Sequence, residues 1–251
     1  MNNRPGLGRS LRPIGPNEFA RVSEYVTALR HRESEVDALL SRIGAMGNLI
    51  LIGGCIRDVS LGLRPRDFDI VIDTRSIDLR EALGGFQYSQ NRFGGYKIQV
   101  SRLVFDVWTV GSNWASRAGI IEHEVDELPH GVFFNVDGLI HSVTGLYSDA
   151  SYFNGAVHSG LLDIVIPDAY VASNPSPEVN VLRALIMKDR WGLSFSPRVE
   201  SYIARWLSQS RDPVGALWDA AGKHYGRRPP LTRLRIRELC QGQSRICREL
   251  Y

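Results

Sequence analysis

Two acidic residues stand two positions apart at the start of an apolar segment. Asp67 and Asp69 flank Phe68, and the run 68–72 has the composition of a β-strand. Since alternate residues of a strand point to the same face, we expect the two carboxylates to project together, which is unfavourable unless a cation holds them. Hard divalent cations such as Mg²⁺ take oxygen ligands and bridge carboxylates to phosphate groups. The spacing therefore predicts a metal-binding pair.

A third acid, Asp106, lies among the apolar residues of the run 104–108. An ionised carboxylate in such surroundings needs a partner. If its strand lies beside that of Asp69, three carboxylates could hold two metal ions about 3.5–4 Å apart. Such a pair activates an attacking hydroxyl and stabilises an in-line displacement at phosphorus.

A glycine pair, Gly53-Gly54, follows the apolar run 48–52 and precedes a short helix that we predict over 55–61. Glycine lets the backbone approach a ligand closely, and the free N–H groups at the start of a helix attract phosphate. Arg57 would lie one turn into that helix. Taken singly, a glycine pair, two spaced acids or one apolar-flanked acid is more often a turn, a solvated loop or a cap. Their order and spacing together favour a site for phosphate and metal.

The elements that must position these residues can be read from periodicity. Short apolar or alternating runs predict strands at 48–52, 68–72, 96–100 and 103–110, with a tight Ser101-Arg102 turn. Asp137-Gly138 between the runs 132–136 and 139–143 predicts a two-residue hairpin, and 161–166 is a further apolar run.

Helices are predicted on both sides of this segment. They begin near Asn17, at Val36, after a Ser76 cap over 77–83, from Val179 and, with Ser196 as its cap, from Pro197. The segment 174–177 reads as a linker.

Composition limits the classes of protein. The chain has 251 residues, 43% of them hydrophobic and 23% charged, with a net charge of +3. These values are ordinary for one or two globular domains and argue against a disordered, collagen-like or coiled-coil chain. Of the 30 basic residues, 27 are arginines, whose guanidinium fork binds phosphate with two hydrogen bonds, although a GC-rich genome explains this bias equally well.

Three cysteines without a CxxC pair suit a reducing compartment. Residues 1–15 lack the apolar core of a secretory signal, and no uncharged run approaches the ~18 residues of a membrane span. We therefore expect a cytoplasmic protein with no membrane contact.

Several motifs together resemble one family. Gly53-Gly-Cys-Ile-Arg-Asp58, Leu61-Gly62 and Asp67-Phe-Asp69 are similar to the head-domain signature of the tRNA nucleotidyltransferases and bacterial poly(A) polymerases, within the DNA polymerase β-like superfamily. Weaker similarity covers 91–96, Phe134-Asn135, 181–184 and 191–193. The resemblance implies an α+β fold in which a mixed sheet flanked by helices is followed by a helical neck-like part.

The resemblance also implies roles for single residues. Asp67 and Asp69 would hold the two metal ions, Mg²⁺ or Mn²⁺, and Asp106 would complete this set and help to deprotonate the acceptor hydroxyl. Gly53, Gly54 and Arg57 would contact the NTP triphosphate. The nucleotide-binding set also includes Asp58 and, in the neck, Arg183.

The implied reaction transfers a nucleoside monophosphate from an NTP to the 3′ end of an RNA, in the first instance tRNA, with release of pyrophosphate. Two motifs depart from the family. The nucleotide-holding RRD motif would align with 129–131, and the base-reading EDxxR motif with 176–180, and neither pattern is present. The phosphate chemistry thus looks intact while base selection looks altered.

Two alternatives stay open. The acceptor could be a protein or a small molecule, as for a toxin of a conflict system. The chain could also be a degenerate head that binds nucleotide or RNA without turnover, although retention of three acids argues against this. We divide the chain into N-terminal tail and helices (1–47), catalytic head (48–145) and a neck-like domain with a basic end (146–251).

Overall fold

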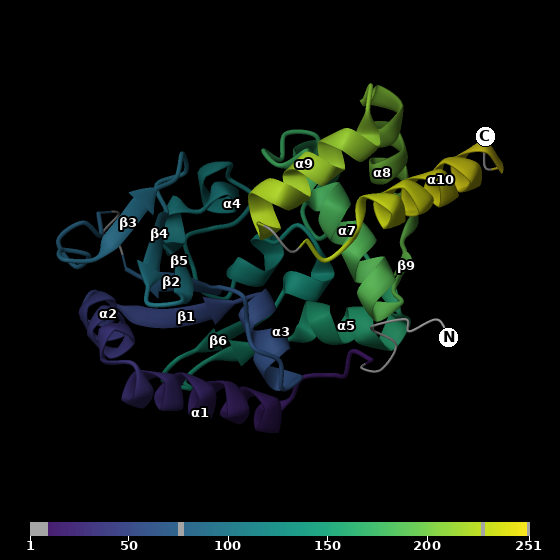
Figure 1. Ribbon diagram of the computed structural model, residues 1–251. Coiled ribbons are helices and arrows are strands. Elements are labelled where there is room, and N and C mark those ends of the chain that lie inside the picture. Colours follow the sequence, from purple (N-terminus) through teal and green to yellow (C-terminus); the bar gives the residue numbers. More distant parts are fainter. Residues whose placement is uncertain (1–9, 75–77, 227–228, 250–251) are drawn as a thin grey trace, which may run out of the picture. The chain divides into compact units, whose positions relative to one another are not determined.

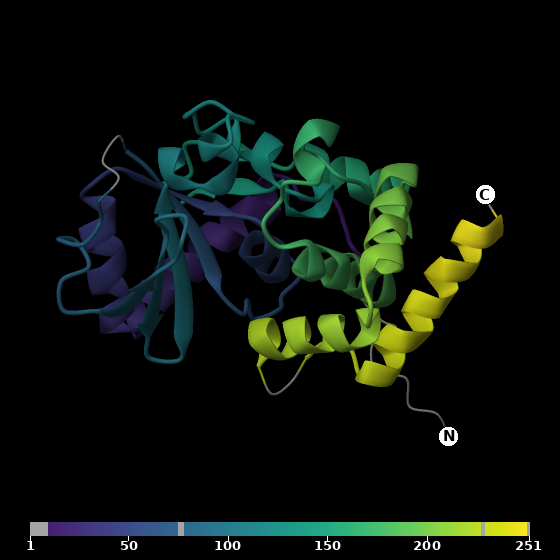
Figure 2. The same cartoon turned by 90° about the horizontal axis from the view of Figure 1, so that it is seen from above.

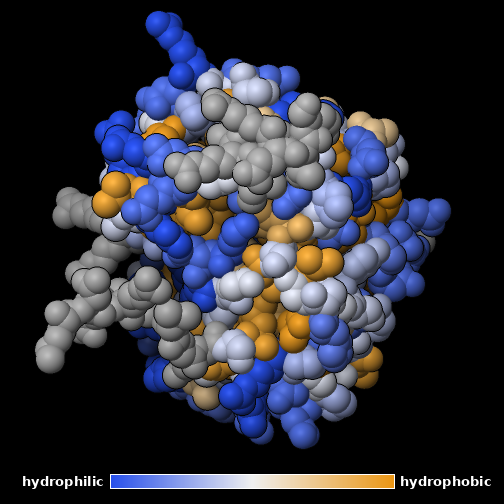
Figure 3. Space-filling model, turned by 90° about the vertical axis from the view of Figure 1, so that its right-hand side faces the viewer, coloured by the Kyte–Doolittle hydropathy of each residue, from blue (hydrophilic) through white to orange (hydrophobic). Residues whose placement is uncertain are grey.

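The computed structural model describes residues 10–74, 78–226 and 229–249 (Figure 1). The chain forms two compact units, one spanning Arg12–His158 and the other beginning at Ser159. None of the helices within the described ranges is long and apolar enough to cross a membrane. On the face drawn in Figure 3, hydrophobic side chains are interspersed with hydrophilic ones.

The first unit contains one mixed sheet of seven strands in the order β3-β4-β5-β2-β1-β6-β7. The strands are β1 (Asn48–Ile52), β2 (Phe68–Asp73), β3 (Gln87–Gln90), β4 (Tyr96–Val100), β5 (Leu103–Thr109), β6 (Ile140–Ser142) and β7 (Ser148–Asp149). Only β2 and β5 pair in parallel within this sheet, and its other neighbouring strands are antiparallel. The mixed α+β fold expected from the sequence is therefore confirmed.

Helices cover one face of this sheet (Figures 1 and 2). They are α1 (Pro16–Arg32), α2 (Ser34–Gly44) and α3 (Gly54–Ser60). Tyr25 of α1 stacks on Phe68 of β2, and Phe68 stacks on Phe105 of β5, with ring centroids 6.3 Å and 5.1 Å apart. Because side chains alternate along a strand, the neighbours of Phe68 and Phe105 in sequence must point to the opposite face.

The opposite face is partly covered by the segment that follows β5. This segment contains a 3₁₀ turn (Val110–Ser112) and the short helix α4 (Trp114–Arg117). Ala115, Ile121 and Leu128 pack against Ile50 and Val71 of the sheet in one buried cluster. This apolar cluster covers part of the face, and Asp69 and Asp106 lie on the same face beyond it.

The predicted hairpin at Asp137-Gly138 is wrong. Asn135–Asp137 forms a 3₁₀ turn, and Ile140–Ser142 pairs with β1 instead of with the run 132–136. The physical reason is burial of the Asp137 side chain, which is 10% exposed and forms an ion pair with Arg57. A hairpin turn would have placed this carboxylate in solvent.

The predicted helix 77–83 is also wrong for its described part, residues 78–83, which forms turns, while the Ser76 cap lies outside the described residues. Asp78 accepts hydrogen bonds from the backbone N–H and the guanidinium of Arg80. Such local side-chain bonds compete with helical hydrogen bonds. Leu79 and Leu83 are nevertheless fully buried, as a helical pattern would require.

The second unit is helical. After α5 (Ser151–Ser159) it contains α6 (Asp168–Val171), α7 (Pro177–Trp191), α8 (Pro197–Gln209), α9 (Pro213–Tyr225) and α10 (Arg233–Glu249), with the short parallel strands β8 (Leu161–Leu162) and β9 (Ser194–Phe195). Only the first two residues of the apolar run 161–166 are a strand.

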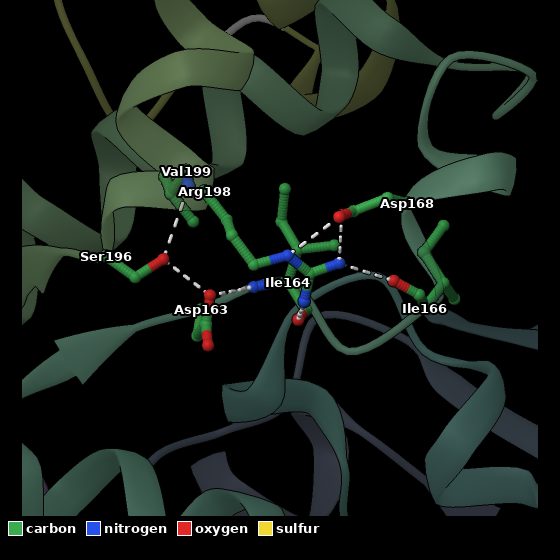
Figure 4. A network of polar contacts seen from close by, with 7 residues as sticks. All are labelled: Asp163, Ile164, Ile166, Asp168, Ser196, Arg198 and Val199. Atoms are coloured by element: carbon green, nitrogen blue, oxygen red, sulfur yellow. Dashed lines mark hydrogen bonds and ion pairs between the residues drawn. The ribbon is translucent and has the colours of Figure 1, made fainter.

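Polar contacts fix the start of α8 in this unit (Figure 4). Ser196 accepts a hydrogen bond from the N–H of Val199, as the predicted cap requires, and donates to Asp163. Arg198 donates to Asp168 and to the backbone carbonyls of Ile164 and Ile166. The loop between β8 and α6 is therefore tied to α8.

Two further predictions concern this unit. The segment 174–177 is no loose linker, because the Asn174 side chain accepts hydrogen bonds from Ser176 N–H and from the Asn180 amide, and Pro177 begins α7. Within the basic end, Arg235 pairs with Asp189 and Glu238. The side chains of Arg227, Arg228, Arg245 and Arg248 lie outside the described residues.

Candidate active site

The structure brings two of the predicted acids together across neighbouring strands. Asp69 of β2 lies directly opposite Asp106 of the parallel strand β5. The same row continues to Ile52 of β1 on one side and Lys97 of β4 on the other. The condition under which the sequence predicted a set of three carboxylates is therefore met.

Asp67 lies just before β2, two residues from Asp69. Its carboxylate is 2.5 Å from Nη2 of Arg66, and its side chain is 21% exposed. Asp67 is half-buried and belongs to the same edge of the sheet face as Asp69. The two carboxylates of the pair thus approach solvent from the start of one strand.

Asp106 has a cationic neighbour that the sequence analysis did not name. Nζ of Lys97 is 3.3 Å from Oδ2 of Asp106, and the Asp106 side chain is also 21% exposed. Burial raises the pKa of Asp106 above the ordinary range for aspartate, and the Lys97 ammonium opposes this shift. Asp106 is therefore a carboxylate for which protonation is easier than for a solvated aspartate.

The glycine pair forms the turn between β1 and α3. Gly53 has φ +72° and ψ −130°, a conformation that L side chains rarely adopt, and its N–H donates to the carbonyl of Leu139 over 2.8 Å. A Cβ atom on Gly54 would lie 3.1 Å from Nη2 of Arg57. The Arg57 guanidinium therefore folds back against the first residue of α3.

Arg57 is buried and is held by two acids. Its Nε donates to Asp58 over 3.2 Å, and its Nη1 lies 3.5 Å from Oδ1 of Asp137. Nη1 makes no hydrogen bond to any atom of the described residues. Asp58, 15% exposed, thus orients Arg57, and Asp137 supplies the second negative charge beside the guanidinium.

Cys55 lies in the same turn, and its thiol is fully buried. Burial, followed by the negative charge of Asp69, raises the thiol pKa far above its ordinary value. A thiol that resists ionisation is a poor nucleophile. Cys55 therefore contributes packing and not covalent chemistry.

An aromatic side chain lies next to the acids. Trp108 follows Asp106 by two residues on the same face of β5 and is half-buried. With Trp114 it packs against the apolar cluster that covers this face. The carboxylate edge thus continues into an indole surface that could border a planar ligand.

Two residues without a predicted site role, Lys97 and Asp137, form ion pairs with the predicted site residues Asp106 and Arg57, respectively. Lys97 could have been found, because a tight Ser101-Arg102 turn pairs Val100 with Leu103 and, by counting, Lys97 with Asp106. Asp137 gave no such signal, since it lies 80 positions from Arg57 and reads as a turn residue.

The remaining predicted residue belongs to the second unit. Arg183 lies on α7 and is half-buried. In the first unit, His130, at the position of the family's RRD motif, accepts or donates a hydrogen bond through Nδ1 with the Tyr152 hydroxyl over 2.8 Å. The side chains of His130 and Tyr152 therefore bond to each other at this position.

The donor set at the carboxylate edge fits a hard divalent cation. Asp67, Asp69 and Asp106 offer carboxylate oxygens, the ligands that Mg²⁺ and Mn²⁺ prefer. In the described part of the chain, no group of three or more His, Cys, Asp or Glu side chains is already arranged around a metal position. Arg66 and Lys97 instead neutralise two of the three acids.

Comparison with known proteins agrees with this geometry. Residues 49–119 match the family described as the poly A polymerase head domain. No curated protein matches the chain.

Solved structures share the fold at low sequence identity. A tRNA-processing enzyme (apo form I) is 19% identical over 94% of this chain, with a TM-score of 0.56. A tRNA nucleotidyltransferase complexed with a primer tRNA and an incoming ATP analog is 22% identical over 79% of this chain, also with a TM-score of 0.56. This chain spans 58% of the length of each. The resemblance expected from the sequence is thus confirmed: residues 49–119 match the poly A polymerase head domain family, and the chain shares the fold of solved structures titled as a tRNA-processing enzyme and a tRNA nucleotidyltransferase.

Proposed function

We propose that this protein is a metal-dependent nucleotidyltransferase that transfers a nucleoside monophosphate from an NTP to the 3′ end of an RNA, with tRNA as the first candidate. The observation that carries the proposal is the row in which Asp69 and Asp106 face each other across parallel strands. Asp67 stands beside this row and the Gly53 turn follows the adjacent strand. The acids proposed to hold cations thus lie at and next to β2, and the turn proposed to receive phosphate follows its neighbour β1.

Each residue has a role in this reaction. Gly53 and Gly54 let the backbone approach the triphosphate, and Arg57, fixed by Asp58 and Asp137, offers it a positive charge. Asp106 accepts the proton of the acceptor hydroxyl. Pyrophosphate is the leaving group.

Asp67, Asp69 and Asp106 would hold the divalent cations, Mg²⁺ or Mn²⁺. When bound, these ions supply positive charge to the reacting phosphate and to the leaving group. Arg66 and Lys97 are the counterions of Asp67 and Asp106 while no cation is bound.

Base selection is proposed to differ from that of the family. The Pro-His-Gly sequence at 129–131 places His130 in a hydrogen bond with Tyr152 instead of presenting two arginines. In the neck, Arg183 on α7 remains as the candidate contact to the nucleotide. We expect weaker discrimination among the four NTPs than an arginine and aspartate template would give.

The experiment offers α-³²P-labelled ATP, CTP, GTP and UTP, each with Mg²⁺ or Mn²⁺, to total tRNA and separately to a protein extract. We expect label on the 3′ end of tRNA, and loss of this label with Asp67→Ala. Label on protein alone would overturn the RNA acceptor. Nucleotide binding without any transfer, in every combination, would overturn the assignment as an enzyme.

A further inference from the structure

A cavity of about 690 Å³ lies in the first unit, away from the carboxylate row. It is bordered by the end of α1, by the segment after α3 and by the β4–β5 turn. Tyr25, which lines it, stacks on Phe68, and the side chain of Phe68 points to the face opposite to Asp67 and Asp69. The cavity therefore opens on the helix-covered side of the sheet.

Three arginines line this cavity: Arg32, Arg64 and Arg102. Each comes from a different border, and all three are exposed. No hydrogen bond or ion pair holds any of their guanidinium groups within the part of the chain that the structure describes. Glu33 is the single acid among the lining residues, so the cavity carries a net positive charge.

The cavity also has an apolar side. Leu29, Val59 and Leu103 are buried and line it together with the ring of Tyr25. At its rim, Ser101 has φ +52° and is the one non-glycine residue with positive φ in the described ranges. This conformation belongs to the two-residue turn that joins β4 and β5.

Size and chemistry together define the ligand class. Small-molecule pockets measure about 300–1,000 Å³ and combine an apolar lining with a few polar groups that fix orientation. Guanidinium groups bind phosphate with paired hydrogen bonds, and an aromatic ring can stack on a base. Glu33 in the lining and Glu35 beside Ser101, with which it forms a hydrogen bond, would repel an extended polyanion. A compact phosphorylated molecule with a planar ring fits better than an RNA strand.

We propose that this cavity is a second nucleotide-binding site, in which Arg32, Arg64 and Arg102 bind the phosphates and the apolar side receives the base. The site is separate from the carboxylate row and needs neither a metal ion nor an acceptor. It goes beyond the proposed transferase function, which stands or falls independently of it.

The test is isothermal titration calorimetry with AMP, ATP and inorganic tripolyphosphate, in EDTA. The variant replaces Arg32, Arg64 and Arg102 with Gln. The matched control replaces three exposed arginines outside the cavity, Arg21, Arg205 and Arg211, with Gln. Both variants therefore change the net charge by the same amount. Circular dichroism checks that both variants fold.

We expect ATP to bind more tightly than tripolyphosphate. We also expect the cavity variant to weaken ATP binding about tenfold or more, and the control variant to change it less than twofold. Equal losses in both variants would overturn the proposal, because the effect would then be general charge. Tripolyphosphate bound as tightly as ATP, or a 12-nucleotide single-stranded RNA bound where AMP and ATP are not, would overturn it as well.

Discussion

The two adjacent glycines of the β1–α3 turn should respond differently to alanine, because different atoms constrain them. At Gly53 the constraint is the backbone, with φ +72° and ψ −130°, while an added Cβ would meet nothing closer than the Asp137 carbonyl oxygen at 3.7 Å. Gly53→Ala is therefore expected to lose about 1–3 kcal/mol of stability through strain. At Gly54 the constraint is the Arg57 guanidinium, 3.1 Å from the new Cβ.

Gly54→Ala should keep or slightly raise stability, since alanine is favoured over glycine in helices by about 0.5–1 kcal/mol. It should instead displace Arg57 by a few tenths of an ångström, which its contacts with Asp58 and Asp137 resist. We expect the KM for NTP to rise about three- to tenfold, because the displaced guanidinium is the group that we propose binds the triphosphate.

Urea unfolding followed by Trp108 and Trp114 fluorescence reports on the first unit alone, once the three tryptophans of the second unit are replaced by Phe. Gly145→Ala is the control, with φ +76° and no atom within 4 Å of its Cβ; it should lose stability without changing KM. Wild-type stability of Gly53→Ala, or a larger stability loss in Gly54→Ala than in Gly53→Ala, would refute the reasoning.

Three other changes test the surroundings of the site. Asp137→Asn should lower the free energy of unfolding by about 1–3 kcal/mol in the same urea assay. This is less than for a fully unpaired buried charge, because Asp58 still pairs with Arg57. An equal loss in the exposed control Asp126→Asn would contradict this. Lys97→Gln should raise the affinity for Mn²⁺ about two- to fivefold, because it removes a competing cation whose side chain is 58% exposed. Electron paramagnetic resonance measures this affinity, with Lys188→Gln as the control. An unchanged affinity would contradict a metal ion at Asp106. Burial lowers the pKa of His141, so as the pH falls the unfolded chain binds a proton at this residue before the folded chain does. Stability therefore decreases below about pH 6.5. His141→Gln should reduce this decrease, whereas the exposed control His158→Gln should not.

The sequence was sufficient for elements whose pattern is local. Periodicity located β1, β4 and α3, and the apolar face of α1 is buried at Phe19, Val22, Val26 and Leu29. It was harder to predict which strands are neighbours in the sheet, because the β3–β4 hairpin separates β2 from β5 in sequence. The parallel pairing of β2 with β5 is what brings Asp69 next to Asp106.

The errors arose where a distant partner overrides a local signal. Asp137-Gly138 has the composition of a hairpin turn, yet the ion pair with Arg57, 80 positions away, and the pairing of β6 with β1 decide its conformation. The role of Asp58 beside Arg57 likewise becomes visible only in the structure. Sequence reasoning therefore identified the charged residues better than it identified their partners.

One matched pair of variants directly tests the row of Asp69 and Asp106 as the centre of the transfer reaction. Asp69→Asn removes a carboxylate from the row, whereas Asp73→Asn removes an exposed one from the last residue of the same strand. Transfer of α-³²P label to tRNA and release of pyrophosphate are measured in single turnover with saturating Mg²⁺ or Mn²⁺. We predict that the transfer rate falls about a hundredfold or more in Asp69→Asn and is unchanged in Asp73→Asn. Equal rates for the two variants would contradict this.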